Sequence, residues 1–121
     1  MELEKAERIA KEILIKMQPF CQAIEIVGSI RRRRPFVNDI DIVCIPENQG
    51  QLIAVLMELG HLKVGGQKII RIATHAKYGI DLDCYIATPA TWATLKLIRT
   101  GSAVHNVKLC SLAKQKGMKL H

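Results

Sequence analysis

The sequence has few aromatic residues, no Cys-x-x-Cys pair and no long apolar run. Aromatic residues occupy 4% of the 121 positions, which excludes base stacking as a major mode of binding. The uncharged apolar stretches, such as residues 51–57, are far shorter than the ~20 residues of a membrane-spanning helix. The first residues, Met1 to Lys5, are too acidic for a secretory signal, so we expect a cytoplasmic protein with no membrane association.

Cysteine is scattered through the chain, at positions 21, 44, 84 and 110, among apolar residues. This arrangement excludes a cysteine zinc site and a dense disulfide framework, because both need paired or closely spaced cysteines. We expect all four to be reduced, and we assign none of them a catalytic role.

Acidic residues are absent after Asp83, whereas the last 38 residues contain six lysines and arginines. The whole chain carries a formal charge of +7 and is 49% apolar, which suits one globular domain over residues 1–121. The basic end predicts a polyanionic partner bound mainly through phosphates, and therefore a strong salt dependence. A solvated basic helix is the alternative interpretation.

Hydrophobic periodicity and turn residues predict an α+β domain with one mixed sheet. We expect helices over residues 3–17, 30–34, 51–59, 89–98 and 103–116, the fourth starting at Pro89. Strands are expected over 23–27, 39–45, 61–64, 68–73 and 80–87, with a turn around 75–79.

Alternating acidic and apolar residues mark two of these strands. Side chains two apart share a face of a strand, so Asp39 and Asp41 project together while Ile40 faces the core. Asp81 and Asp83 repeat the pattern. If the strands are neighbours, the carboxylates repel unless a cation lies between them, and hard oxygen ligands favour Mg²⁺. Solvated aspartates at strand ends are the alternative, especially for Asp81 after its turn.

A possible phosphate site precedes the first acidic pair. Gly28 and Ser29 end a strand and begin a helical turn, and four arginines follow at 31–34. Backbone N–H groups at such a turn, the serine hydroxyl and an arginine can together hold a phosphate. Taken alone, the arginine run is more typical of a localisation-like or solvated basic segment, and the acids that follow favour the phosphate site.

These motifs together resemble the nucleotidyltransferase superfamily with a polymerase beta-like palm, and most closely the X-family DNA polymerases. The resemblance extends over nearly the whole chain, in five ordered blocks at 28–32, 38–41, 82–83, 100–106 and 112–120. The family's spacing from its third aspartate to Thr100-Gly101-Ser102 selects Asp83 over Asp81.

The resemblance implies a palm with a short C-terminal thumb-like helix and a two-metal transfer reaction. A nucleoside monophosphate would pass from a deoxyribo- or ribonucleoside triphosphate to the 3′-hydroxyl of a DNA or RNA primer or primer-template. The catalytic and metal-binding residues would be Asp39, Asp41 and Asp83. They would hold two Mg²⁺ ions, for which Mn²⁺ can substitute.

The same resemblance implies a nucleotide site at Gly28, Ser29, Arg32, Asn38, Gly101, Ser102 and Asn106. Ser29 and Arg32 would hold the β and γ phosphates, and Asn106 would touch the incoming base. From charge and position we assign nucleic-acid contacts to Arg99, His105, Lys108 and Lys114. The family's separate DNA-gripping domain is not recognisable in this sequence, and self-association or an accessory protein could compensate.

Two other functions remain open from the sequence. One is a small-substrate or protein-modifying nucleotidyltransferase, although such enzymes generally lack the block at 100–106. The other is a basic nucleic-acid-binding module with an inactive site. Ile98 and Arg99 replace the family's usual aromatic pair and Cys110 replaces an arginine, so sugar selection and template dependence are not predicted.

Overall fold

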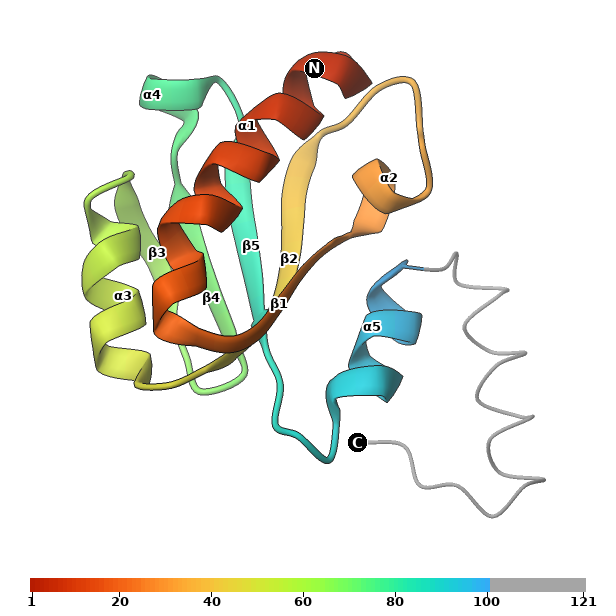
Figure 1. Ribbon diagram of the computed structural model, residues 1–121. Coiled ribbons are helices and arrows are strands. Elements are labelled where there is room, and N and C mark those ends of the chain that lie inside the picture. The colour runs from red at the N-terminus through yellow and green to blue at the C-terminus, as the bar shows by residue number, and fades with distance from the viewer. Residues whose placement is uncertain (101–121) are drawn as a thin grey trace, which may run out of the picture.

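The computed structural model describes residues 1–100 as an α+β domain built on a five-stranded mixed sheet (Figure 1). Its helical elements are α1 (Leu3–Met17), η1 (Gln18–Phe20), α2 (Gly28–Arg31), α3 (Gln49–Met57), α4 (His75–Tyr78) and α5 (Trp92–Thr100). Its strands are β1 (Cys21–Val27), β2 (Asp39–Pro46), β3 (His61–Gly65), β4 (Ile69–Ala73) and β5 (Asp81–Ile86). The predicted fold class is confirmed, while the thumb-like helix expected over 103–116 lies outside the described residues.

The sheet has the order β1-β2-β5-β4-β3, in which β2 and β5 are parallel and the other neighbours are antiparallel. Parallel neighbours begin at the same edge of a sheet. Asp39 is therefore level with Asp81, and Asp41 with Asp83. This register places the two acidic strands beside each other.

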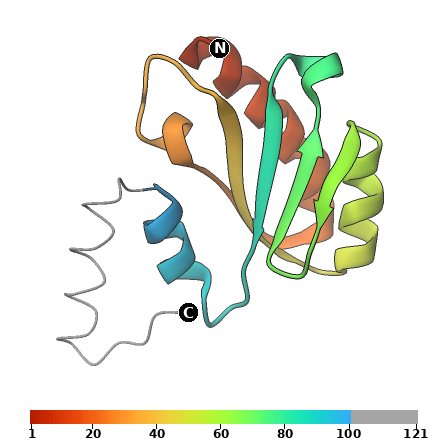
Figure 2. The same ribbon diagram turned by 180° about the vertical axis from the view of Figure 1, so that it is seen from behind.

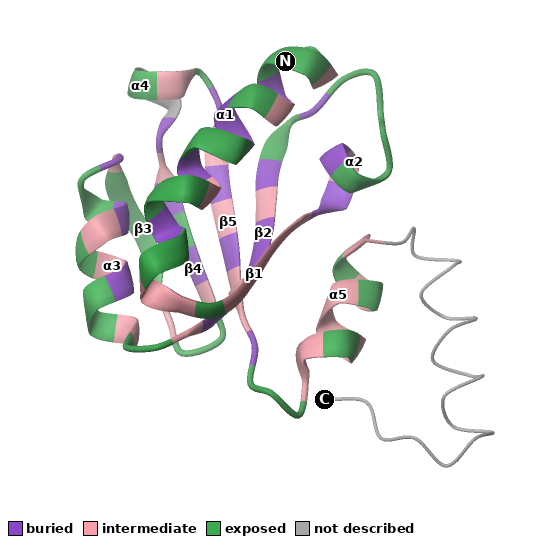
Figure 3. Ribbon diagram, in the orientation of Figure 1, coloured by how far each residue is buried: buried purple, intermediate pink, exposed green. Residues whose placement is uncertain are grey.

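The two faces of the sheet differ in how they are covered. α1 and α3 pack on one face, behind the strands in Figure 2, where Ile40, Ile42 and Leu82 are completely buried. On the opposite face α5 packs only over a smaller cluster that includes Val43 and Trp92. Buried and less buried positions accordingly alternate over residues 39–42 of β2 and 81–85 of β5, while the second half of β2 is buried on both faces (Figure 3). The carboxylates lie on the partly covered face, as the alternation predicted.

Several helix boundaries differ from the prediction. α2 begins at Gly28, two residues early, with the Arg32 N–H bonded to the Gly28 carbonyl at 3.0 Å. α3 begins at Gln49 because the Asn48 side chain caps it, accepting from the Gln51 N–H at 3.0 Å. The predicted turn around 75–79 contains the short helix α4.

The prediction that Pro89 starts a helix is wrong. Pro89 lies in a turn closed by two threonines, in which the Thr88 N–H donates to Thr91 Oγ1 at 2.9 Å and the Thr91 N–H to Thr88 Oγ1 at 3.2 Å. α5 then begins at Trp92. The threonine side chains satisfy the turn's donors and so move the helix start three residues along the chain.

The cysteines that the structure describes are free, as predicted: Cys44 and Cys84 are buried and Cys21 is half-buried. Cys110 lies beyond residue 100. Trp92, the first residue of α5, packs against the smaller cluster. Within residues 1–100, no helix is long and apolar enough to cross a bilayer.

Candidate active site

Four carboxylates lie at the beginnings of β2 and β5. Asp39 is exposed, while Asp41, Asp81 and Asp83 are half-buried. The parallel register brings the pairs together from positions about 40 residues apart in sequence. The two acidic strands are therefore neighbours, which is the condition under which the sequence predicts a cluster of carboxylates.

Asp41 is the most perturbed of these acids. Burial, followed by the neighbouring Asp83 carboxylate, raises the pKa of Asp41 to about 6. A hydrogen bond from the Tyr85 hydroxyl to Asp41 Oδ1, 3.3 Å long, acts in the opposite direction. The fold thus makes the charged form of Asp41 less favourable than it is in water, and a cation nearby would stabilise that form.

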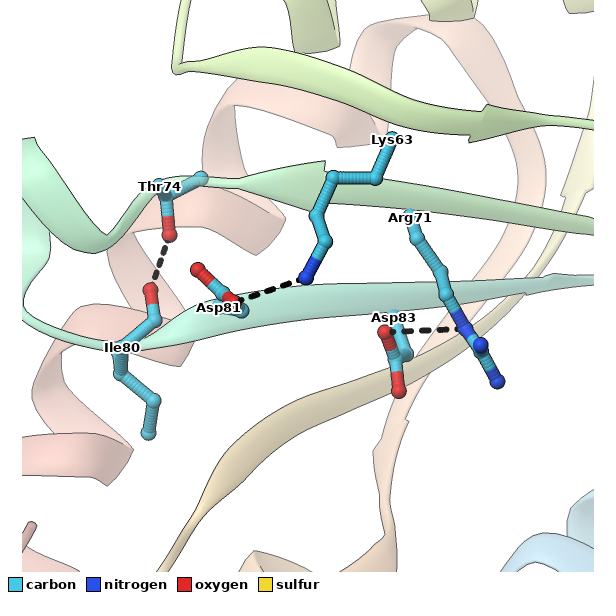
Figure 4. Close-up of polar contacts among 6 residues, drawn as sticks. All are labelled: Lys63, Arg71, Thr74, Ile80, Asp81 and Asp83. Atoms are coloured by element: carbon cyan, nitrogen blue, oxygen red, sulfur yellow. Dashed lines mark hydrogen bonds and ion pairs between the residues drawn. The ribbon is translucent and has the colours of Figure 1, made fainter.

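Asp81 and Asp83 face cations from the β3–β4 hairpin (Figure 4). Lys63 Nζ lies 3.4 Å from Asp81 Oδ2, and Arg71 Nε lies 3.6 Å from Asp83 Oδ1. Burial raises the pKa of Asp83, while Arg71 partly offsets the shift. These ion pairs partly offset the repulsion between the carboxylates, so two side chains of the protein supply part of the positive charge that the sequence predicts beside the acids.

A polar pocket of about 280 Å³ opens between these side chains. It is lined by Asp39, Lys63, Arg71, Ile72, Asp81 and Asp83. The Oδ1 atom of Asp81 is buried and has no hydrogen-bond partner among the described residues. A buried carboxylate oxygen without a partner is costly, and a bound cation would satisfy it.

Gly28 lies against the side chain of Asp41, which does not itself line this pocket. Its φ of +69° is a left-handed conformation that favours glycine. A Cβ at this position would lie 2.9 Å from Asp41 Cβ and even closer to Asp41 Oδ2. The glycine of the Gly28-Ser29 motif therefore allows the turn to approach the acidic strand.

The arginine run is divided between two sides of the molecule. Arg32 donates to the Thr100 carbonyl at 3.0 Å and, more weakly, to Ser29 Oγ at 3.4 Å. Arg33, at φ 61°, instead donates to Glu7 of α1 at 2.7 Å. The structure thus brings Arg32 together with Ser29, as the phosphate-site hypothesis requires, and directs Arg33 away.

Two of the remaining predicted residues, Asn38 and Arg99, lie within residues 1–100, and the others lie beyond residue 100. Asn38 is exposed immediately before β2, and the Arg99 guanidinium lies 4.3 Å from the centre of the Tyr85 ring. Gly101, Ser102, His105, Asn106, Lys108 and Lys114 all lie beyond residue 100. Their assigned contacts stay predictions.

The donor set fits Mg²⁺ in its chemistry, because carboxylate oxygens are the ligands this ion prefers. In residues 1–100, however, no three His, Cys, Asp or Glu side chains are arranged as a metal-binding group. Asp81 and Asp83 are directed toward Lys63 and Arg71 instead (Figure 4). An entering cation would therefore compete with these two side chains.

Sequence reasoning missed Lys63, Arg71 and Tyr85. Tyr85 follows Asp83 by two residues and so shares its face, a signal that was available in the sequence. The contributions of Lys63 and Arg71 depend on β4 lying beside β5, and no local pattern specifies that neighbour.

Comparison with known proteins adds one relative of named activity. The chain is 28% identical, over 120 aligned residues, to a protein of Bacillus subtilis (strain 168) named DNA polymerase/3'-5' exonuclease PolX. The alignment covers 95% of this chain and 21% of that protein, so the chain corresponds to about a fifth of the relative's length. No family model matches the chain. The chain is thus distantly similar, along nearly all of its length, to part of a DNA polymerase.

Proposed function

We propose that this chain is a polymerase X-like nucleotidyltransferase domain, spanning residues 1–121, that adds nucleotides to a nucleic-acid 3′ end. The observation that carries the proposal is the parallel pairing of β2 with β5, which sets Asp39 and Asp41 beside Asp83 and next to the Gly28 turn. The distant similarity to a DNA polymerase supports the same assignment.

In this proposal each group acts at a defined place. Asp39 and Asp41 would hold two Mg²⁺ ions, and Asp83 would hold only the one beside the attacking hydroxyl. Bound there, the metal would supply a lowered pKa for that hydroxyl, and the second ion would supply positive charge that neutralises the triphosphate. Ser29 and Arg32 would bind the β and γ phosphates and orient the triphosphate for in-line attack. Gly28 would keep the turn close to Asp41, with Asn38 at the rim.

Arg99 and residues beyond position 100 would complete the proposed site. Gly101 and Ser102 would form a backbone turn under the sugar, and Asn106 would touch the base. Arg99, His105, Lys108 and Lys114 would hold the nucleic acid. Of these residues, Arg99 also contacts the ring of Tyr85 on β5.

Primer extension tests the proposal. The full chain is assayed with Mg²⁺ or Mn²⁺ on labelled single-stranded, primed and gapped DNA, with each ribo- and deoxyribonucleoside triphosphate. Asp41→Asn removes a charge without changing size and should reduce extension by at least ~10²-fold. Glu58→Gln removes an exposed carboxylate after α3 and should leave extension unchanged. Equal extension by wild type and Asp41→Asn would refute the proposal.

A second candidate, a nucleic-acid-binding module without catalysis, is favoured by one observation. Lys63 and Arg71 already pair with two of the four clustered carboxylates, so the acids do not by themselves demand a metal. Such a module would bind DNA and lose orders of magnitude of affinity between about 50 and about 200 mM salt if ~6 phosphates are contacted. DNA binding without extension on any substrate would select this candidate.

A further inference from the structure

Tyr85 reaches the candidate site from β5, although it belongs to none of the recognised motifs. Its hydroxyl donates to Asp41 Oδ1 at 3.3 Å. Its ring is half-buried against the smaller core cluster beneath α5. The Arg99 guanidinium lies over the same ring, 4.3 Å from its centre. Tyr85 therefore links α5 to one of the acidic side chains.

Asp41 is restrained on two sides. Tyr85 engages Oδ1, while Oδ2 lies on the side of Gly28, where even a methyl group would not fit. The backbone limits where the carboxylate can lie, and the tyrosine hydroxyl selects its rotation within that space. Removing the hydroxyl therefore widens the rotation open to the carboxylate, while the restraint from the glycine turn stays in place.

We propose that Tyr85 is a positioning residue that fixes the Asp41 carboxylate for divalent-cation binding and transfer, with Arg99 of α5 holding its ring. The catalytic part of this inference rests on the proposed function. The orientation of Asp41 by the hydroxyl is a property of the fold alone.

A positioning role has a defined experimental signature. Loss of a hydrogen-bonding partner behind a metal ligand typically weakens metal binding or activity ~10- to 100-fold. Because the bond from Tyr85 to Asp41 is long, at 3.3 Å, we expect Tyr85→Phe to have an effect near the lower end of this range. The expected losses are ~10-fold in Mn²⁺ affinity and ~10-fold in kcat. The KM for the triphosphate should stay constant, because the Tyr85 hydroxyl donates to Asp41, whereas the phosphates would be bound by Ser29 and Arg32.

The experiment uses the chain's two tyrosines as a matched pair. Tyr85→Phe is compared with Tyr78→Phe, whose hydroxyl accepts a hydrogen bond from Lys16 instead. Binding of MnCl₂ to the full chain is measured by electron paramagnetic resonance, and kcat and KM by primer extension. Unchanged or tighter Mn²⁺ binding by Tyr85→Phe would overturn the inference, as would a wild-type chain that binds no Mn²⁺.

A second variant covers the case in which Tyr85→Phe does not fold. Arg99→Gln removes the charge over the ring, leaves the hydroxyl in place and should weaken Mn²⁺ binding by ~2- to 3-fold. If the wild type binds Mn²⁺ but extends no primer, the proposed function fails while the Mn²⁺ comparison still decides the role of Tyr85. If the wild type extends primers and both variants match it in binding and kcat, only the role of Tyr85 fails.

Discussion

β2 and β5 carry the same acidic and apolar alternation, in register and in parallel, yet their aspartates have different surroundings. On β5, Asp81 and Asp83 each pair with a cation from the β3–β4 hairpin. On β2, Asp41 is instead crowded by the Gly28 backbone and hydrogen-bonded by Tyr85. The carboxylates of β5 are therefore stabilised by ion pairs, whereas Asp41 of β2 is stabilised by a hydrogen bond from an uncharged hydroxyl.

The sheet order explains the difference. β5 lies between β2 and β4, so its outward side chains meet those of β4, including Arg71. β2 lies between β5 and β1, and the β1 partner of Asp41 is the apolar Val27. Equal sequence patterns thus acquire different electrostatics from unequal neighbours: cations face Asp81 and Asp83 on β5, whereas Asp41 on β2 is hydrogen-bonded by a tyrosine hydroxyl.

The largest expected effect distinguishes the two acids of β5. Asp83→Asn should lower primer extension by at least ~10²-fold, because Asp83 is level with Asp41 at the proposed centre. Asp81→Asn should lower it by less than ~10-fold, because Asp81 lies one pair further from Asp41 and already binds Lys63. Both rates are measured at saturating triphosphate and metal. A reversed order of the two variants would contradict the choice of Asp83.

Alanine substitutions at two glycines test whether the Gly28 backbone crowds Asp41 of β2. Gly28→Ala should lower the free energy of unfolding by ~3 kcal/mol, from the left-handed conformation and the collision with Asp41. Gly79→Ala is the control, since Gly79 also has a positive φ, +76°, but among the described side chains a Cβ there meets only that of Met1, at 3.6 Å. Its expected loss is ~1 kcal/mol. Equal losses in urea unfolding would show that Asp41 is not crowded.

The charge on Asp41 predicts a pH dependence of stability. Its pKa in the folded chain, about 6, exceeds the ordinary 3.8, so the folded state binds the proton more tightly than the unfolded state does. The contribution of Asp41 is therefore most favourable below about pH 4 and is lost as the pH rises through about 6. Asp41→Asn should gain stability over wild type across this range in EDTA. The free energies of unfolding of the two proteins are measured with urea at each pH. A difference between them that stays constant with pH would contradict this prediction.

The smallest effect concerns the cations that face β5. Arg71→Gln should tighten Mn²⁺ binding by ~2- to 5-fold, because exposed ion pairs contribute only about 0.2–1 kcal/mol and the arginine competes for Asp83. Lys63→Gln should change it less, since Lys63 binds Asp81. Calorimetric titration measures both affinities. Weaker binding by Arg71→Gln would show that the arginine supports the site rather than competing for it.

Much of the site was predictable because it rests on local rules. The alternation along residues 39–42 correctly predicted that Ile40 and Ile42 enter the core. The Gly28-Ser29 turn was expected where it is found, although α2 begins at Gly28 itself. Pro89 misled the prediction because a proline suits either a first helical position or a turn, and the two threonines beside it decided for the turn.

The sequence by itself determined which side chains are apolar, which alternate and where the chain can turn, because these properties depend on residues a few positions apart. Only the tertiary structure decided that Lys63 and Arg71 meet the acids of β5 while Tyr85 bonds the Asp41 of β2. These contacts depend on which strands become neighbours and in which register. That choice is made by packing across the whole sheet, so short-range patterns do not encode it.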